Sequence, residues 1–161
     1  MHNTIFKLLF FSFFILIISN GCLKNEDPIP IDPRPQSVID DSLIQNYLVK
    51  NSLTAIKHSS GLYYIIKTEG TGINPSLSNQ VTVHYKGYLL TGSQFDGTTT
   101  TPVTFRLGGL IQGWQIGIPL IKKGGDIKLL LPSDLAYGQT GSGSIGPNQV
   151  LIFDIQLVNV Y

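Results

Sequence analysis

The sequence has little charge and only one cysteine. Charged residues make up 13% of the 161 residues, and a single cysteine excludes an intramolecular disulfide. Lys7 is the one charged residue in residues 1–21, and without it the 11 basic side chains become 10, equal to the 10 acidic ones. A neutral body gives no electrostatic basis for binding nucleic acid. His58 and His84 lie far apart and outside any ligand-like motif, so we predict no metal site and no cofactor.

Residues 1–21 have the pattern of a signal peptide. A basic start at Lys7 is followed by the apolar run Leu8–Ile18 and then by small and polar residues. The run is shorter than the about 20 apolar residues that a membrane-spanning helix needs. Small residues before Cys22 resemble the lipobox of bacterial lipoproteins, although Ser19 stands where leucine is more usual. An ordinary secretory signal with an incidental cysteine, or an uncleaved anchor, remains an alternative.

The lipobox resemblance implies cleavage before Cys22 and a diacylglycerol on its sulfur. The protein would then be anchored by lipid to a membrane of the bacterial cell envelope, with the outer-membrane or periplasmic side expected. Residues 22–37 would form the tether, because their four prolines favour an extended, semi-stiff spacer over a helix.

Residues 38–60 form a pre-domain segment. Apolar side chains recur at helical spacing over residues 38–50, which predicts a short amphipathic helix capped by Ser37 or Asp40. Residues 51–60 are expected to connect this helix to the body. The helix would dock on the domain or pair two copies, so a monomer or a weak dimer is open.

Residues 61–161 show the two-residue periodicity of strands. Apolar positions alternate or run together in Leu62–Ile66, Val81–Tyr85, Val103–Leu107, Ile127–Leu131 and Leu151–Leu157. One short helix fits over Gly113–Leu120, limited by Pro119. The pattern predicts an α+β fold, an antiparallel β-sheet curved around one short helix, with a pocket between them.

A series of short motifs within residues 61–161 occurs in the order known from one enzyme family. The motifs are Val83–Gly87, Gly92–Asp96, Phe105–Gly108, Leu110–Trp114, Lys123–Gly125, Leu135–Gly138 and Leu151–Asp154. Together they resemble the FKBP-type peptidyl-prolyl cis/trans isomerases. The resemblance implies an FKBP-like fold, an enzyme without a cofactor, and proline-containing polypeptides as substrates. It leaves open whether the macrolide immunosuppressants that define the family would bind.

The same resemblance implies a substrate pocket. Catalytic positions would be Tyr85, Asp96, Ile111 and Tyr137, with the Ile111 N–H and the Tyr137 hydroxyl bound to substrate carbonyls. Substrate would contact Phe95, Val103, Leu110, Trp114, Ile145 and Phe153, with Trp114 as the floor. Each residue also has a plainer interpretation, as a core aromatic, a turn aspartate or a loop anchor. The order of the motifs favours the pocket.

Two departures from the family pattern bear on activity. Val103 stands where a third aromatic residue is frequent. Gly97–Thr101 has no basic residue, whereas many members have an arginine there that pairs with the aspartate, so Asp96 must rely on Tyr85 or backbone donors. We therefore weigh an active isomerase that assists the folding of exported proteins against a non-catalytic peptide-binding or chaperone module. A structural lipoprotein of a surface complex is a third hypothesis.

Overall fold

The computed structural model describes residues 32–161. The expected signal peptide, Cys22 and most of the expected tether lie outside the described residues. Within the described range, the helices are too short or too polar to cross a membrane.

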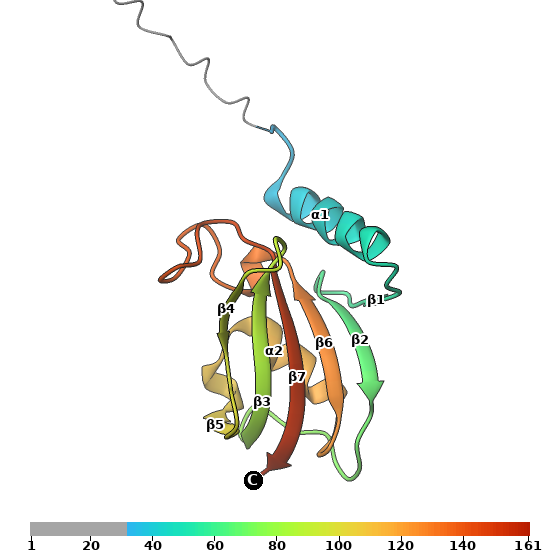
Figure 1. The fold of residues 1–161 in the computed structure, drawn as a ribbon, viewed down its shortest axis with the longest axis vertical. Helices are drawn as coiled ribbons and strands as arrows, with labels where there is room; N and C mark the ends of the chain where they lie inside the picture. Colours follow the sequence, from blue (N-terminus) through green and yellow to red (C-terminus); the bar gives the residue numbers. More distant parts are fainter. Residues whose placement is uncertain (1–31) are drawn as a thin grey trace, which may run out of the picture. The chain divides into compact units, whose positions relative to one another are not determined.

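A seven-stranded antiparallel sheet forms the body of the protein (Figure 1). Its strands are β1 Ile56–Lys57, β2 Tyr63–Thr68, β3 Gln80–Leu89, β4 Gln94–Gly97, β5 Val103–Arg106, β6 Asp126–Leu131 and β7 Leu151–Val160. They lie in the order β1-β2-β6-β7-β3-β4, and β5 pairs with the first part of β3. The predicted sheet is confirmed. The short strands β1 and β4 were not predicted, because two and four residues show no clear alternation.

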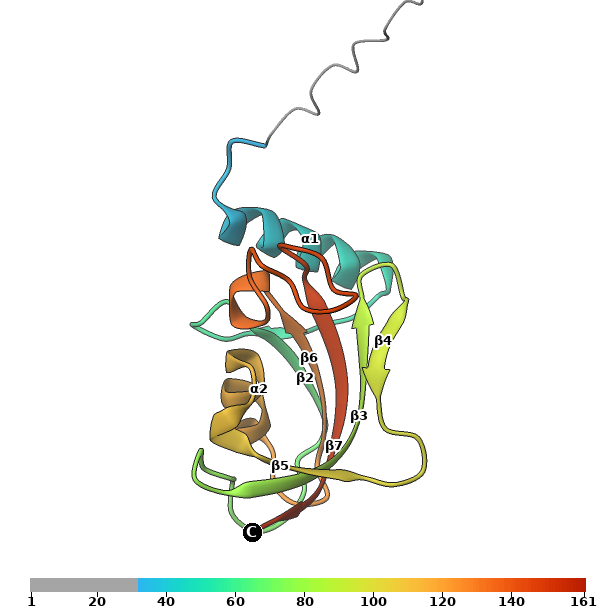
Figure 2. The same cartoon turned by 90° about the vertical axis from the view of Figure 1, so that its left-hand side faces the viewer.

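The short internal helix is confirmed as α2, Gln112–Gly117, which continues as a 3₁₀ turn over Ile118–Leu120. Figure 2 shows α2 on the face around which the sheet curves. The helix lies close to the sheet because Gly113 has no side chain; a Cβ atom there would collide with the side chain of Leu131. Two further 3₁₀ turns are Leu107–Gly109 and Ser133–Leu135.

The main core lies between α2 and the sheet. On β7 the alternate residues Leu151, Phe153, Ile155 and Leu157 are each at most 3% exposed and belong to this core. They share one face of the strand because successive side chains point to opposite faces. Trp114 and Ile118 pack against them from the helical side.

Helix α1, Gln36–Lys50, lies across one end of the sheet (Figures 1 and 2). Its buried residues Asp40, Ile44 and Leu48 recur every fourth position and form one face. Ile44 and Leu48 pack in a second cluster with Tyr63, Leu130, Val150 and Ile152. The helix thus docks on the sheet through apolar side chains.

The start of α1 differs from the sequence prediction. The helix begins at Gln36, and Pro35 occupies the N-cap position without a side-chain cap. The expected cap by Ser37 or Asp40 is therefore wrong. Asp40 is fully buried one turn inside the helix, where its carboxylate bonds to Ser133 instead.

Candidate active site

A cavity of about 170 Å³ opens between α2 and the sheet. Its walls come from β3, β4, β5, the start of α2, the turn after Ser133–Leu135, and β7. The lining residues are Tyr85, Phe95, Asp96, Phe105, Leu110, Ile111, Trp114, Tyr137 and Phe153. The structure therefore brings together eight of the ten residues expected from the sequence, and adds Phe105.

The floor of the cavity is a set of aromatic rings packed edge-on around Trp114. The indole, 4% exposed, has its ring centre 5.1 Å from that of Tyr85 and 5.2 Å from that of Phe153. The Phe105 ring lies 6.2 Å away on another side. Edge-to-face contacts of this kind fix the rings relative to one another, so the apolar surface is in place before a ligand arrives.

The side wall depends on a glycine in β3. Phe95 and Phe153 pack edge-on with ring centres 5.6 Å apart. A Cβ atom at Gly87 would lie 2.7 Å from the Phe95 ring and 2.9 Å from the Phe153 ring. Only glycine at this position leaves room for both rings.

Asp96 lies exposed at the rim and is held by two donors. The Tyr85 hydroxyl donates to Oδ2 at 2.8 Å, and the Gly97 N–H donates to Oδ1 at 2.7 Å. Burial, together with the hydrogen bond to Asp96, raises the pKa of Tyr85 to about 12. The phenol therefore remains a donor at neutral pH.

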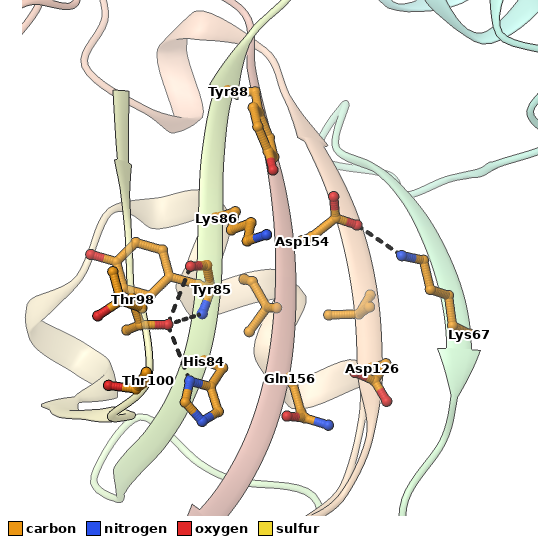
Figure 3. A pocket seen from close by; sticks show the side chains of 13 residues that line it. Lys67, His84, Tyr85, Lys86, Tyr88, Thr98, Thr100, Asp126, Asp154 and Gln156 are labelled. Carbon is orange, nitrogen blue, oxygen red and sulfur yellow. Dashed lines mark hydrogen bonds and ion pairs between the residues drawn. The ribbon is translucent and has the colours of Figure 1, made fainter. Parts of the chain in front are cut away.

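Thr98 holds the segment that follows Asp96. Its hydroxyl accepts the Tyr85 N–H at 3.1 Å, and its own N–H donates to the Tyr85 carbonyl at 2.9 Å. Figure 3 shows the same hydroxyl beside the ring of His84, 3.2 Å from Nδ1. These contacts fasten the segment to β3 without a basic residue.

Two further polar groups line the cavity. Ile111 is the N-cap residue of α2, where backbone N–H groups lack intrahelical acceptors. Tyr137 is 36% exposed, and none of the hydrogen bonds within residues 32–161 involves its hydroxyl. Both can face a bound ligand.

The structure differs from expectation at Val103. This residue is 41% exposed at the start of the edge strand β5 and does not line the cavity. Phe105, one alternation further along, packs edge-on against Tyr85 and Trp114. Period-two alternation places positions 103 and 105 on the same side of a strand, so the sequence carried a signal that could have found Phe105.

Ile145 also differs from expectation. It is 7% exposed, belongs to the main core and does not line the cavity. The loop around it is closed by its own backbone bonds: Ser142 and Ile145 exchange two hydrogen bonds, and the Asn148 N–H donates to the Gly138 carbonyl at 2.8 Å. In this closed loop, Ile145 packs with the main core.

A second, wider depression of about 540 Å³ lies on the outer face of the sheet (Figure 3). At its centre Asp154 accepts from Lys67 at 2.9 Å and Lys128 at 2.8 Å. Burial pushes the pKa of Asp154 up, but the bonds from the two lysines outweigh it and hold the pKa below its usual value. The paired charge of Asp154 and its polar neighbours distinguish this depression from the aromatic cavity. Within residues 32–161, no three His, Cys, Asp or Glu side chains gather to hold a metal ion.

Comparison with known proteins gives one family. Residues 72–158 match the sequence profile of the FKBP-type peptidyl-prolyl cis-trans isomerases. The FKBP-type peptidyl-prolyl cis-trans isomerase FkpA of Escherichia coli K12 is 47% identical over 104 residues, which cover 63% of this chain and 38% of that protein. The chain thus matches well under half of that relative's length.

Solved structures agree with the family. The crystal structure of FkpA from E. coli superposes with a TM-score of 0.69 at 40% identity, covering 77% of this chain and 60% of that one. A peptidyl-prolyl cis-trans isomerase from Pseudomonas syringae pv. tomato DC3000 gives a TM-score of 0.66 at 30% identity, covering 81% and 98%.

Proposed function

The chain belongs to the FKBP-type peptidyl-prolyl cis-trans isomerase family, and on that premise we propose that it catalyses rotation about prolyl peptide bonds in polypeptides. The observation that carries the proposal is the aromatic cavity above Trp114, with Asp96 held at its rim by Tyr85 and Gly97. This arrangement offers an apolar site for a proline ring beside fixed polar groups for the peptide backbone.

The reaction needs no nucleophile and no metal, because no covalent bond is made or broken. Rotation about an amide loses the resonance of the C–N bond and meets a barrier of about 18–20 kcal/mol. Without a catalyst, a prolyl bond takes tens to hundreds of seconds to isomerise. Each ~1.4 kcal/mol removed from the barrier gives a tenfold acceleration.

An apolar pocket lowers this barrier by removing water. The planar amide carries charge on its oxygen and is solvated well, whereas the amide twisted by 90° has lost that charge separation. Transfer into the cavity disfavours the planar form more than the twisted one, which brings the ground state closer to the transition state. The rings of Phe95, Phe105, Trp114 and Phe153 would supply the apolar surface.

The polar groups would position the peptide rather than transfer protons. We assign the Ile111 N–H and the Tyr137 hydroxyl to substrate carbonyls on the two sides of the proline. Asp96, oriented by Tyr85, would complete the rim. These groups resist rotation of the flanking peptide, so the twist is confined to the prolyl bond.

A non-catalytic peptide-binding or chaperone module is the second candidate, and the absence of a basic residue in Gly97–Thr101 is the observation that favours it. Against it, Tyr85 and Gly97 supply donors to Asp96, and Phe105 supplies the ring that Val103 lacks. These contacts support turnover as the leading proposal. The wider role, assistance to exported proteins from a lipid anchor at Cys22, rests on the sequence of residues 1–22.

Relaxation of an Ala-Xaa-Pro-Phe peptide from cis to trans tests the proposal. We expect acceleration by the protein, and a loss of about tenfold in kcat/KM for Asp96→Asn and for Tyr137→Phe, since each removes one hydrogen bond of ~1–1.5 kcal/mol. Matched controls are Glu69→Gln, an exposed carboxylate outside the cavity, and Tyr161→Phe, a tyrosine that is 67% exposed. Peptide binding without acceleration at micromolar protein would favour the non-catalytic module.

A further inference from the structure

A buried carboxylate lies in helix α1, outside the matched family region of residues 72–158. Asp40 is 0% exposed and sits in the same buried face as Ile44 and Leu48. Burial of a carboxylate is unfavourable unless hydrogen bonds replace the lost water. The carboxylate of Asp40 therefore needs hydrogen-bond donors inside the protein.

The partners come from two elements. Gln36, one turn earlier in α1, donates its side-chain amide to Oδ1 of Asp40 at 2.7 Å. Ser133 donates both its backbone N–H and its hydroxyl to Oδ2, each at 2.7 Å. Asp40 and Ser133 are 93 positions apart in the chain, so this contact joins the pre-domain helix to the body.

Ser133 in turn organises the turn that carries Tyr137. Its carbonyl accepts the N–H of Ala136 at 3.0 Å and the N–H of Gly138 at 2.8 Å. The residues on both sides of Tyr137 are thus bonded to one oxygen. Gly138 adopts φ +56°, a conformation that lets the chain turn back after the tyrosine.

We propose that Asp40 is a positioning residue for the candidate active site. This role rests on the isomerase function proposed above. Asp40 fixes Ser133, and Ser133 fixes the turn that presents the Tyr137 hydroxyl to substrate. Helix α1 is then part of the catalytic unit, although it precedes the matched family region.

The physical reason is the cost of a buried donor without an acceptor. If the carboxylate is removed, the Ser133 N–H and hydroxyl lose their partner in a site that is 1% exposed. The turn must then move to satisfy them. Misplacement of a positioning group by about 1 Å can lower a rate by up to about a hundredfold.

The neighbouring Asp41 offers a matched control. Its carboxylate also joins α1 to the body, through the Tyr63 hydroxyl at 2.8 Å and the amine of Lys57, but it bonds nothing in Ser133–Leu135. On the full chain in mild detergent, Asp40→Ala is expected to lower kcat/KM about tenfold and Asp41→Ala less than twofold. Equal losses in the two variants would overturn the proposal.

A conservative variant and a double variant separate positioning from general support of the fold. Asp40→Asn keeps an oxygen that accepts both Ser133 donors, while Gln36 can turn its amide, so activity should stay within about threefold of wild type. In a Tyr137→Phe background, Asp40→Ala should lose less than about threefold, because the hydroxyl that it positions is already gone. A full tenfold loss in that background would contradict the route through Tyr137.

Amide hydrogen exchange gives a readout independent of turnover. The amides of Ala136 and Gly138 should exchange at least about tenfold faster in Asp40→Ala and at the wild-type rate in Asp41→Ala. Absence of isomerase activity in the wild type, with this exchange pattern intact, would reject the proposed function but keep the positioning of the turn. Unchanged exchange in Asp40→Ala would reject the positioning itself.

A milder variant covers the case in which Asp40→Ala fails to fold. Ser133→Ala removes the hydroxyl bond but keeps the N–H bond to Asp40. We expect smaller effects in the same direction: kcat/KM about threefold lower and amide exchange at Gly138 about threefold faster. Wild-type behaviour in both readouts would also overturn the proposal.

Discussion

At the scale of residues, the pocket carries its negative charge on Asp96, the one carboxylate among the nine lining residues. A phenol and a backbone N–H, rather than a guanidinium, orient it. The orientation of Asp96 therefore depends on a protonated Tyr85, because an ionised phenolate would repel the carboxylate. The raised pKa of Tyr85 extends to alkaline pH the range over which the protonated phenol donates to Asp96.

Tyr85 should therefore ionise near pH 12, whereas an ordinary tyrosine ionises near 10.0. The chief cause of this raised pKa is the burial of Tyr85, and the second is its hydrogen bond to Asp96. Since the pKa is raised in the folded state, the stabilisation from Tyr85 is present below pH ~10 and is lost as the pH rises toward 12. A ¹³C NMR titration of the tyrosine rings measures this directly. Asp96→Asn should move the pKa of Tyr85 back toward 10. An unchanged pKa of Tyr85 in this variant would contradict the assignment.

At the scale of elements, α1 covers one end of the outer face of the sheet. Leu130 and Ile152 lie on the face opposite α2 and are at most 2% exposed, since α1 covers them. This explains why Leu129–Leu131 is apolar at every position although strands covered on one side alternate. The pre-domain helix is a structural part of the folded body.

Ile44→Ala tests this packing. The side chain is 0% exposed in the second cluster, so its truncation should lower the free energy of unfolding by about 2–4 kcal/mol. Val49→Ala on the same helix is the control, because Val49 is 81% exposed and should change stability by less than about 0.5 kcal/mol. Urea titrations of the two variants compare them; similar midpoints would show that α1 does not stabilise the sheet.

At the scale of the whole molecule, the proposed lipid anchor would join the folded domain to a membrane through residues outside the described range. A lipid on Cys22 would suffice for stable attachment, because two or three acyl chains bind firmly where one binds only marginally. The tether that follows would hold the pocket clear of the membrane surface.

Labelling with a radioactive fatty acid tests the anchor. The wild-type chain should take up label and sediment with membranes, and Cys22→Ser should lose both properties. Ser19→Leu, which restores the residue more usual at that position, should keep the label. Label that persists in Cys22→Ser would show that the lipid is not attached to Cys22.

The sequence alone determined the class of fold and the order of its parts. Alternation along Leu151–Leu157 identified a central strand, and Pro119 limited the internal helix to a few turns. These predictions succeeded because they depend on local backbone geometry, which a short stretch of residues dictates. The motif order predicted the family for the same reason, since each motif is read within a few positions.

Only the tertiary structure decided which residues meet. It placed Phe105 rather than Val103 in the cavity wall, and it placed Ile145 in the core. It also turned Asp40 from an expected helix cap into the partner of Ser133. Each outcome depends on contacts between distant segments, 93 positions apart for Asp40, and no local pattern of residues specifies such a contact.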